Sequence, residues 1–115
     1  MKVRGIDHVA INVKDMAASA RFYADVLGLE RLKTVPFGEA EITYFAIPGG
    51  GRIELFDYKG TSADPKRGET EVGLRHLAFQ IEGVAEAERE LRKKGVPITL
   101  PTTELPELGV PSAIS

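Results

Sequence analysis

Two stretches of the sequence, GIDHVAINVKD at Gly5–Asp15 and GLRHLAFQIEG at Gly73–Gly83, align with each other without a gap. Each begins with a glycine and carries a histidine at its fourth position, His8 in the first copy and His76 in the second. These are the only two histidines among the 115 residues. The repeat predicts two related structural units that keep the two imidazoles at equivalent positions.

Each copy alternates in the way that a β-strand does. In the first copy, three apolar residues share one face, and His8 lies on the other face with Ala10 and Asn12. The second copy repeats this arrangement, with His76 opposite three apolar residues. One face of each strand is therefore predicted to join the core, whereas the other face carries an imidazole, a methyl group and an amide.

A helix is predicted after each copy of the repeat. Asp15 is a favourable N-cap for a helix over Met16–Leu27, and Gly28 is the glycine expected just after its end. The second helix is predicted over Val84–Lys94, with Gly95 ending it. Both units therefore begin with a strand followed by a helix.

Three strands are predicted to follow the first helix, from the runs ERLKTV, AEITYFAI and RIELFDY. A hairpin turn is predicted at Pro48–Gly51, between the last two. Residues 5–59 thus form a β-α-β-β-β unit. Phe37 and Tyr44 are both candidates for lining a pocket, although core packing is the favoured interpretation for Tyr44.

The second unit is predicted over residues 73–115, after a polar linker at Lys59–Val72. After its helix, one short strand is expected at Val96–Pro101. The two copies are offset by 68 residues (73 − 5), so the counterpart of residue 54 would be position 122, beyond Ser115. The second unit is therefore expected to be incomplete, in a single α+β domain over residues 1–115.

Glu54 joins the histidines as a candidate site residue. In the run RIELF, Ile53 and Leu55 take the core face, so Glu54 faces the same way as His8 if both strands join one sheet. A carboxylate within an apolar strand is costly unless it is paired, hydrogen-bonded or metal-bound. A single strand histidine is usually just hydrogen-bonded, and a single strand glutamate is usually exposed. The shared repeat position of the histidines is what favours a site for a divalent transition metal.

The composition is that of an ordinary soluble globular protein, 43% hydrophobic and 28% charged. Fifteen Lys and Arg against seventeen Asp and Glu give a net charge of −2, so neither nucleic acid nor a membrane is an expected partner. No apolar run approaches the roughly 18 residues of a membrane span, and no signal-peptide core follows the N-terminus. The absence of cysteine excludes disulfides and thiolate metal ligands. A cytoplasmic location is expected.

The segment DHVAINVKDMAASARFYADVLGLE, together with GLRHLAFQIEGV, resembles the vicinal oxygen chelate superfamily. That group includes glyoxalase I, methylmalonyl-CoA epimerase, extradiol ring-cleaving dioxygenases, fosfomycin-resistance proteins and bleomycin-binding proteins. The resemblance extends from about Gly5 to Pro101. It implies two βαβββ units whose strands form a curved mixed sheet around a metal-binding cavity.

The resemblance also implies a set of metal ligands on the first and fourth strands of the units. Carried onto this sequence, these are His8, Glu54 and His76. Their order resembles that of bacterial glyoxalase I, whose fourth ligand is a glutamate on the last strand. No residue of this sequence matches that glutamate. Glu54 is the candidate catalytic group, as a ligand or as a base, and the metal would be Ni, Zn, Fe, Mn or Co.

The function that the resemblance implies is a metal-dependent glyoxalase-type lyase or isomerase. It would act on a small oxygenated metabolite by chelating two neighbouring oxygens on the metal. Two alternatives remain open at this stage, an extradiol-type ring-cleaving dioxygenase and a metal-free drug-binding protein of the bleomycin-resistance type. A homodimer is expected, because a sheet of this kind leaves edges and an apolar face that a second copy can cover.

Overall fold

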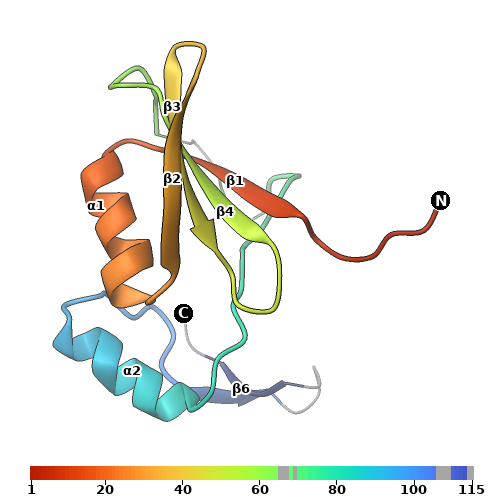
Figure 1. The fold of residues 1–115 in the computed structure, drawn as a ribbon. Helices are drawn as coiled ribbons and strands as arrows, with labels where there is room; N and C mark the ends of the chain where they lie inside the picture. Colours follow the sequence, from red (N-terminus) through yellow and green to blue (C-terminus); the bar gives the residue numbers. More distant parts are fainter. Residues whose placement is uncertain (65–67, 69, 106–109, 114–115) are drawn as a thin grey trace. The chain divides into compact units, whose positions relative to one another are not determined.

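The computed structural model describes residues 1–64, 68, 70–105 and 110–113 (Figure 1). The chain separates into two compact units, unit 1 over Met1–Lys66 and unit 2 over Arg67–Ser115. No helix among the described residues is long and apolar enough to cross a membrane.

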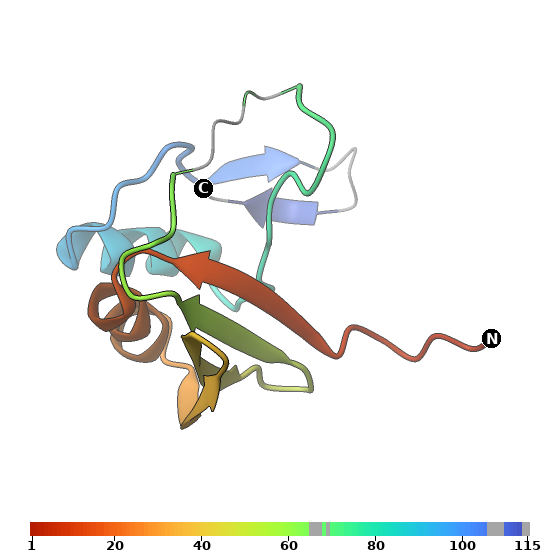
Figure 2. The same ribbon diagram turned by 90° about the horizontal axis from the view of Figure 1, so that it is seen from above.

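Unit 1 is built on a mixed sheet of four strands in the order β1-β4-β3-β2. Its strands are β1 (His8–Val13), β2 (Glu30–Phe37), β3 (Ala40–Ala46) and β4 (Arg52–Asp57). The pair β1–β4 is parallel, and the pairs β2–β3 and β3–β4 are antiparallel. Figure 2 shows β1 alongside β4. The predicted α+β class and the β-α-β-β-β order of the first unit are confirmed.

The first helix begins where the sequence predicts, but it has two parts. The helix α1 (Met16–Arg21) is capped by Asp15, whose Oδ1 accepts a hydrogen bond from the backbone N–H of Ala18 at 3.1 Å. It continues as the π-helical turn η1 (Phe22–Val26). The turn is wider than an α-turn because the N–H of Leu27 donates to the carbonyl of Phe22, five residues earlier. Gly28 follows with a φ of 70°, as expected for the residue after a helix.

The core of unit 1 lies between α1 with η1 and one face of the sheet (Figures 1 and 2). Phe45, Ile53 and Leu55 are fully buried there. The ring of Tyr23 in η1 packs against that of Phe45 with centroids 5.9 Å apart. The buried hydroxyl of Thr43 is satisfied by that of Thr34 across the β2–β3 ladder, 2.9 Å away. One face of β4 is thus committed to packing, which leaves the opposite face for Glu54.

The predicted hairpin turn between β3 and β4 holds the start of β1 against β4. The carbonyl of Gly51 accepts from the N–H of Ile47, and the N–H of Arg52 donates to the carbonyl of Asp7, both at 3.1 Å. Gly51 has a φ of 87°, and a Cβ there would lie 3.3 Å from the carbonyl oxygen of Ile6. Only glycine combines this conformation with so close an approach of two backbone segments.

Unit 2 contains the helix α2 (Val84–Lys93) and a two-stranded antiparallel sheet of β5 (Thr103–Leu105) and β6 (Val110–Ala113). The helix agrees with its predicted range to one residue, and Gly95 follows it with a φ of 75°. The assignment of residues 1–115 to one domain, with units at 5–59 and 73–115, stays a prediction.

Two predicted strands of unit 2 are wrong. The repeat segment Gly73–Gly83 is not a β-strand, and neither is Val96–Pro101. A strand needs a neighbour to receive its backbone hydrogen bonds. In unit 1, β1 finds this neighbour in β4. Among the described residues of unit 2, the only strands, β5 and β6, pair with each other, and neither of them forms a ladder with the second copy of the repeat.

A carboxylate joins α2 to the segment that follows it. Glu88 accepts hydrogen bonds from the backbone N–H of Thr102, from the Thr102 hydroxyl at 2.9 Å, and from Nε of Arg92 at 3.2 Å. These donors, led by the backbone N–H of Thr102, lower the pKa of Glu88 below its ordinary 4.5. A second ion pair on this helix, Glu90–Lys94, spans 3.0 Å.

This contact predicts how unit 2 responds to acid. Because the pKa of Glu88 is lower in the folded chain, its contribution to stability is complete above pH 4.5 and is lost as the pH falls through the lowered value. NMR titration should give a Glu88 pKa below 4.5, and Thr102→Val should raise it by removing one donor. Thr61→Val, which removes a hydroxyl from unit 1, should leave it unchanged. A Glu88 pKa at or above 4.5 in the unmodified protein would contradict this account.

Candidate functional site

His8 and Glu54 lie beside each other on the sheet face opposite α1. In the parallel ladder, His8 is the partner of Arg52, and Ala10 is the partner of Glu54. Nδ1 of His8 lies 3.4 Å from Oε2 of Glu54. The structure therefore brings together two of the three candidate ligands, as the alternation along both strands predicted.

Glu54 is an unusual residue for the middle of a strand, because only 6% of it is exposed. Apart from His8, its ion-pair contact among the described residues is Nη2 of Arg52, at 3.5 Å. Both contacts are longer than a strong charge-assisted hydrogen bond, and both use the same oxygen, Oε2. Burying a carboxylate with such loose compensation costs stability, so a function is the better reason for its presence.

Asp7 belongs to the same cluster, although strand alternation in the sequence does not mark it as a site residue. Its Oδ2 lies 2.7 Å from Nδ1 of His8 and 3.3 Å from Nη2 of Arg52. The hydrogen bond with His8, followed by the charge of Arg52, lowers the pKa of Asp7 below its ordinary 3.8. Asp7 is thus ionised at neutral pH and holds the imidazole in place. The sequence feature that could have identified Asp7 is its position directly before His8, the histidine of the first repeat.

The third candidate ligand, His76, belongs to unit 2, where it is exposed in the segment that does not form a strand. Within the residues that the structure describes, no three His, Asp or Glu side chains are gathered in a geometry that would hold a metal ion. His8 and Glu54 nonetheless fit part of such a donor set. They place an imidazole nitrogen and a poorly hydrated carboxylate side by side, and divalent transition metals take both ligand types.

A hollow of about 340 Å³ opens on unit 1 close to this cluster, lined by Leu32, Lys33, Tyr44 and Arg52. The guanidinium carbon of Arg52 lies 5.5 Å from the centre of the Tyr44 ring, within the range of a cation–π contact. Tyr44 is the ladder partner of Glu54. The expectation that Tyr44 packs in the core is therefore wrong, because its position on β3 places it on the face of Glu54.

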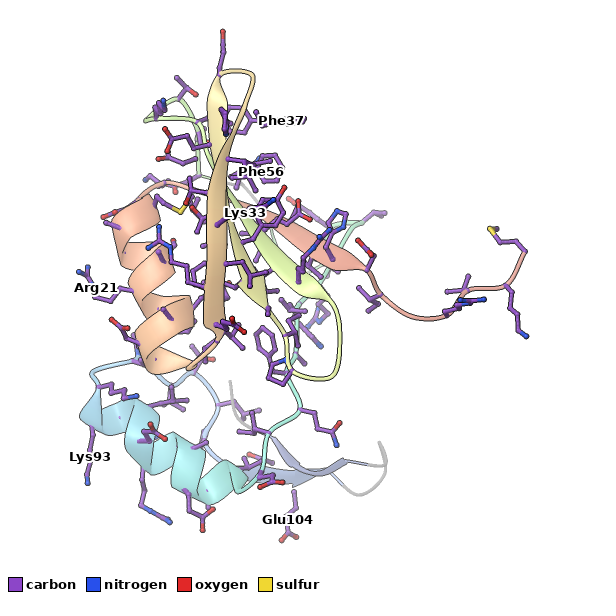
Figure 3. The ribbon with its side chains drawn as sticks, in the orientation of Figure 1. Arg21, Lys33, Phe37, Phe56, Lys93 and Glu104 are labelled. Atoms are coloured by element: carbon purple, nitrogen blue, oxygen red, sulfur yellow. The ribbon has the colours of Figure 1, made fainter. Side chains whose placement is uncertain are left out.

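Aromatic side chains occupy another part of unit 1, near the far end of β4. The rings of Phe37 and Phe56 meet edge to face with centroids 5.8 Å apart, and Phe56 stacks on Tyr58 at 6.4 Å. Figure 3 shows Phe37 and Phe56 close together on the side of β2 away from α1. Phe37 is 60% exposed, so an apolar surface adjoins the charged cluster on this part of the sheet.

The model of the Glyoxalase/Bleomycin resistance protein/Dioxygenase superfamily matches residues 5–109. The chain belongs to this superfamily. The match covers both copies of the repeat, and it confirms the resemblance that the sequence carries.

Several individual proteins are similar to this chain. YaeR, an uncharacterized protein of Escherichia coli K12, is 34% identical over 97 residues, which are 82% of this chain and 74% of YaeR. A superfamily domain from Frankia sp. EAN1pec is 32% identical with a TM-score of 0.76, over 91% of this chain and 84% of that one. The trypanothione-dependent glyoxalase I of Leishmania major is 26% identical with a TM-score of 0.69, over 84% and 70%.

The burial of Glu54 predicts that this carboxylate lowers the free energy of unfolding of the metal-free protein. In the metal-free protein, Glu54→Gln should preserve or raise the free energy of unfolding, by about 0.5–2 kcal/mol, because an amide is cheaper to bury than a charge. Urea unfolding followed by circular dichroism measures this. Glu41→Gln, at a half-exposed carboxylate on β3, is the matched control and should change stability by less than about 0.5 kcal/mol. A clear loss of stability in Glu54→Gln alone would show that the carboxylate is structural.

Proposed function

We propose that this chain is a metal-dependent lyase or isomerase of the glyoxalase type. Its substrate would be a small oxygenated metabolite with two neighbouring oxygens. The observation that carries the proposal is the contact between His8 and the buried Glu54, in a chain that belongs to this superfamily. The likeness to a glyoxalase I in fold and sequence supports it.

The residues that would hold the metal are His8, Glu54 and His76. Two imidazoles and one carboxylate suit a divalent transition metal such as Ni, Zn, Fe, Mn or Co. Asp7 and Glu54 both contact Nδ1 of His8. A metal would therefore bind the imidazole either at Nδ1, in place of the hydrogen bond to Asp7, or at Nε2, with Asp7 orienting the ring through Nδ1.

When bound, the metal supplies Lewis-acid stabilisation of the negative charge that develops on the chelated oxygens. The protein's own contribution is to position the substrate and to move a proton. All ion-pair contacts of Glu54 in the described part of the chain use Oε2. Its other oxygen, Oε1, is therefore free to coordinate the metal or to take a proton from the substrate carbon beside the chelated oxygens. Arg52, through Nη2, holds both Glu54 and Asp7.

Metal binding is the first test. The purified protein should bind a divalent metal, measured by calorimetry and elemental analysis, and affinity should fall by about tenfold or more in His8→Ala, Glu54→Gln and His76→Ala, since three protein ligands leave none to spare. Glu41→Gln should bind as the unmodified protein does. Metal content unchanged in both histidine variants would refute the site.

Proton transfer separates the proposed reaction from the two alternatives. The metal-loaded protein should catalyse exchange of the carbon-bound protons of dihydroxyacetone with D₂O under anaerobic conditions, observed by NMR. Glu54→Gln should slow this exchange by about 10²-fold or more, the scale of a general base. A ring-cleaving dioxygenase would instead need oxygen for turnover, and a metal-free drug-binding protein would neither take up metal nor catalyse exchange.

We also propose that the protein is a homodimer whose metal site is shared. The outer strands of the unit 1 sheet, β1 and β2, have open edges among the described residues, and such edges favour association. In this arrangement, His8 and Glu54 of one copy would meet His76 of the partner subunit.

Light scattering at micromolar concentration should give about 25 kDa, twice the chain mass of 12.5 kDa. Mixing His8→Ala with His76→Ala protein should restore metal binding, because each mixed dimer regains one intact shared site. A monomeric mass would contradict the dimer, and a dimer without restoration would place the whole site within one chain.

A further inference from the structure

We propose that the hollow formed by Leu32, Lys33, Tyr44 and Arg52 binds an anionic group of the substrate, a carboxylate or a phosphate. The inference rests on the proposed function and narrows it, because it makes the substrate an anionic metabolite. The chelated oxygens would lie at His8 and Glu54, and the anionic group would lie in the hollow beside them.

A β-bulge in β2 creates this hollow. The register between β2 and β3 shifts by one residue between Arg31 and Thr34, so Leu32 and Lys33 together stand opposite the single Tyr44. In a regular strand, two successive side chains point to opposite faces, and only one of them would reach the hollow. A bulge redirects a side chain in this way and is often found beside a functional site. The bulge thus brings Lys33 beside Tyr44, which is the ladder partner of Glu54.

The hollow contains two positively charged side chains, Lys33 and Arg52, that have unused hydrogen-bond donors. In the part of the chain that the structure describes, Arg52 uses only Nη2 for its ion pairs with Asp7 and Glu54, which leaves Nε and Nη1 to donate elsewhere. Lys33 has no ion pair among those residues. Tyr44 stacks against the guanidinium of Arg52 and restricts its motion. A held arginine with free donors, next to a lysine, is well suited to a carboxylate or phosphate.

The distance between the two parts of the site suits a small molecule. Arg52 forms one wall of the hollow and also touches Glu54 at 3.5 Å, and Tyr44 and Glu54 are ladder partners. Directly paired strand residues lie about 5 Å apart. An anionic group two or three carbons from the chelated oxygens would therefore reach Lys33 and Arg52. The volume of about 340 Å³ is at the small end of ligand sites.

Matched hydroxamates test the inference, because a hydroxamate presents two neighbouring oxygens to a metal. Butanohydroxamate ends in a methyl group, succinic acid monohydroxamate replaces that methyl with a carboxylate, and 3-phosphonopropanohydroxamate carries a phosphonate. Calorimetry on the metal-loaded protein should show at least one anionic compound binding about tenfold or more tighter than butanohydroxamate, the scale of hydrogen bonds to charged groups. The tighter of the two identifies the anion as carboxylate-like or phosphate-like.

Lys33→Met should remove most of this advantage while leaving the affinity for butanohydroxamate unchanged, which also shows that the variant is folded. Lys14→Met, which removes a lysine paired with Asp64 elsewhere in unit 1, should retain the advantage. Equal affinity for the neutral and anionic compounds, or an advantage that survives Lys33→Met, overturns the inference alone. If none of the three hydroxamates binds the metal-loaded protein, the proposed function fails, and the inference fails with it.

Discussion

The parallel pairing of β1 with β4 is the constraint on which the candidate site depends. These strands are the first and last of their unit, and α1, η1 and the β2–β3 hairpin lie between them in the chain. The pairing begins at the hydrogen bond from Arg52 N–H to the Asp7 carbonyl, where Gly51 lets the two backbones approach. It brings His8 beside Glu54, residues that are 46 positions apart (54 − 8).

Four charged or titratable side chains meet at this junction and compensate one another only in part. Arg52 serves two carboxylates through one nitrogen, and His8 lies between the same two carboxylates. The outer member, Asp7, is exposed and well satisfied, whereas the inner member, Glu54, is buried with long contacts. Such an arrangement is expensive as a purely structural element. The arrangement is reasonable for a site that binds a cation, because a metal would supply the compensating positive charge that the Glu54 carboxylate lacks.

The rest of unit 1 supports this junction from two sides. On one face, the sheet packs against α1 and η1 and buries Phe45, Ile53 and Leu55 completely. This packing makes the sheet rigid. On the other face, the bulge in β2 opens a basic hollow next to the carboxylate. Site residues on strands are held more firmly than residues on loops. A rigid pair of candidate ligands beside a basic hollow would suit the small anionic metabolite that we propose as the substrate.

Local patterns in the sequence were sufficient for much of this description. The α+β class, the order of elements in unit 1, the Asp15 cap and the shared face of His8 and Glu54 all follow from strand alternation and helix-end preferences, which act over a few residues. Tertiary structure alone decided the rest. The role of Asp7, the position of Tyr44 and the hollow depend on register and on a one-residue bulge, which no local pattern specifies. The segment Gly73–Gly83 has the pattern of a strand and does not form one within unit 2, because a strand exists only when another segment of chain completes its hydrogen bonds.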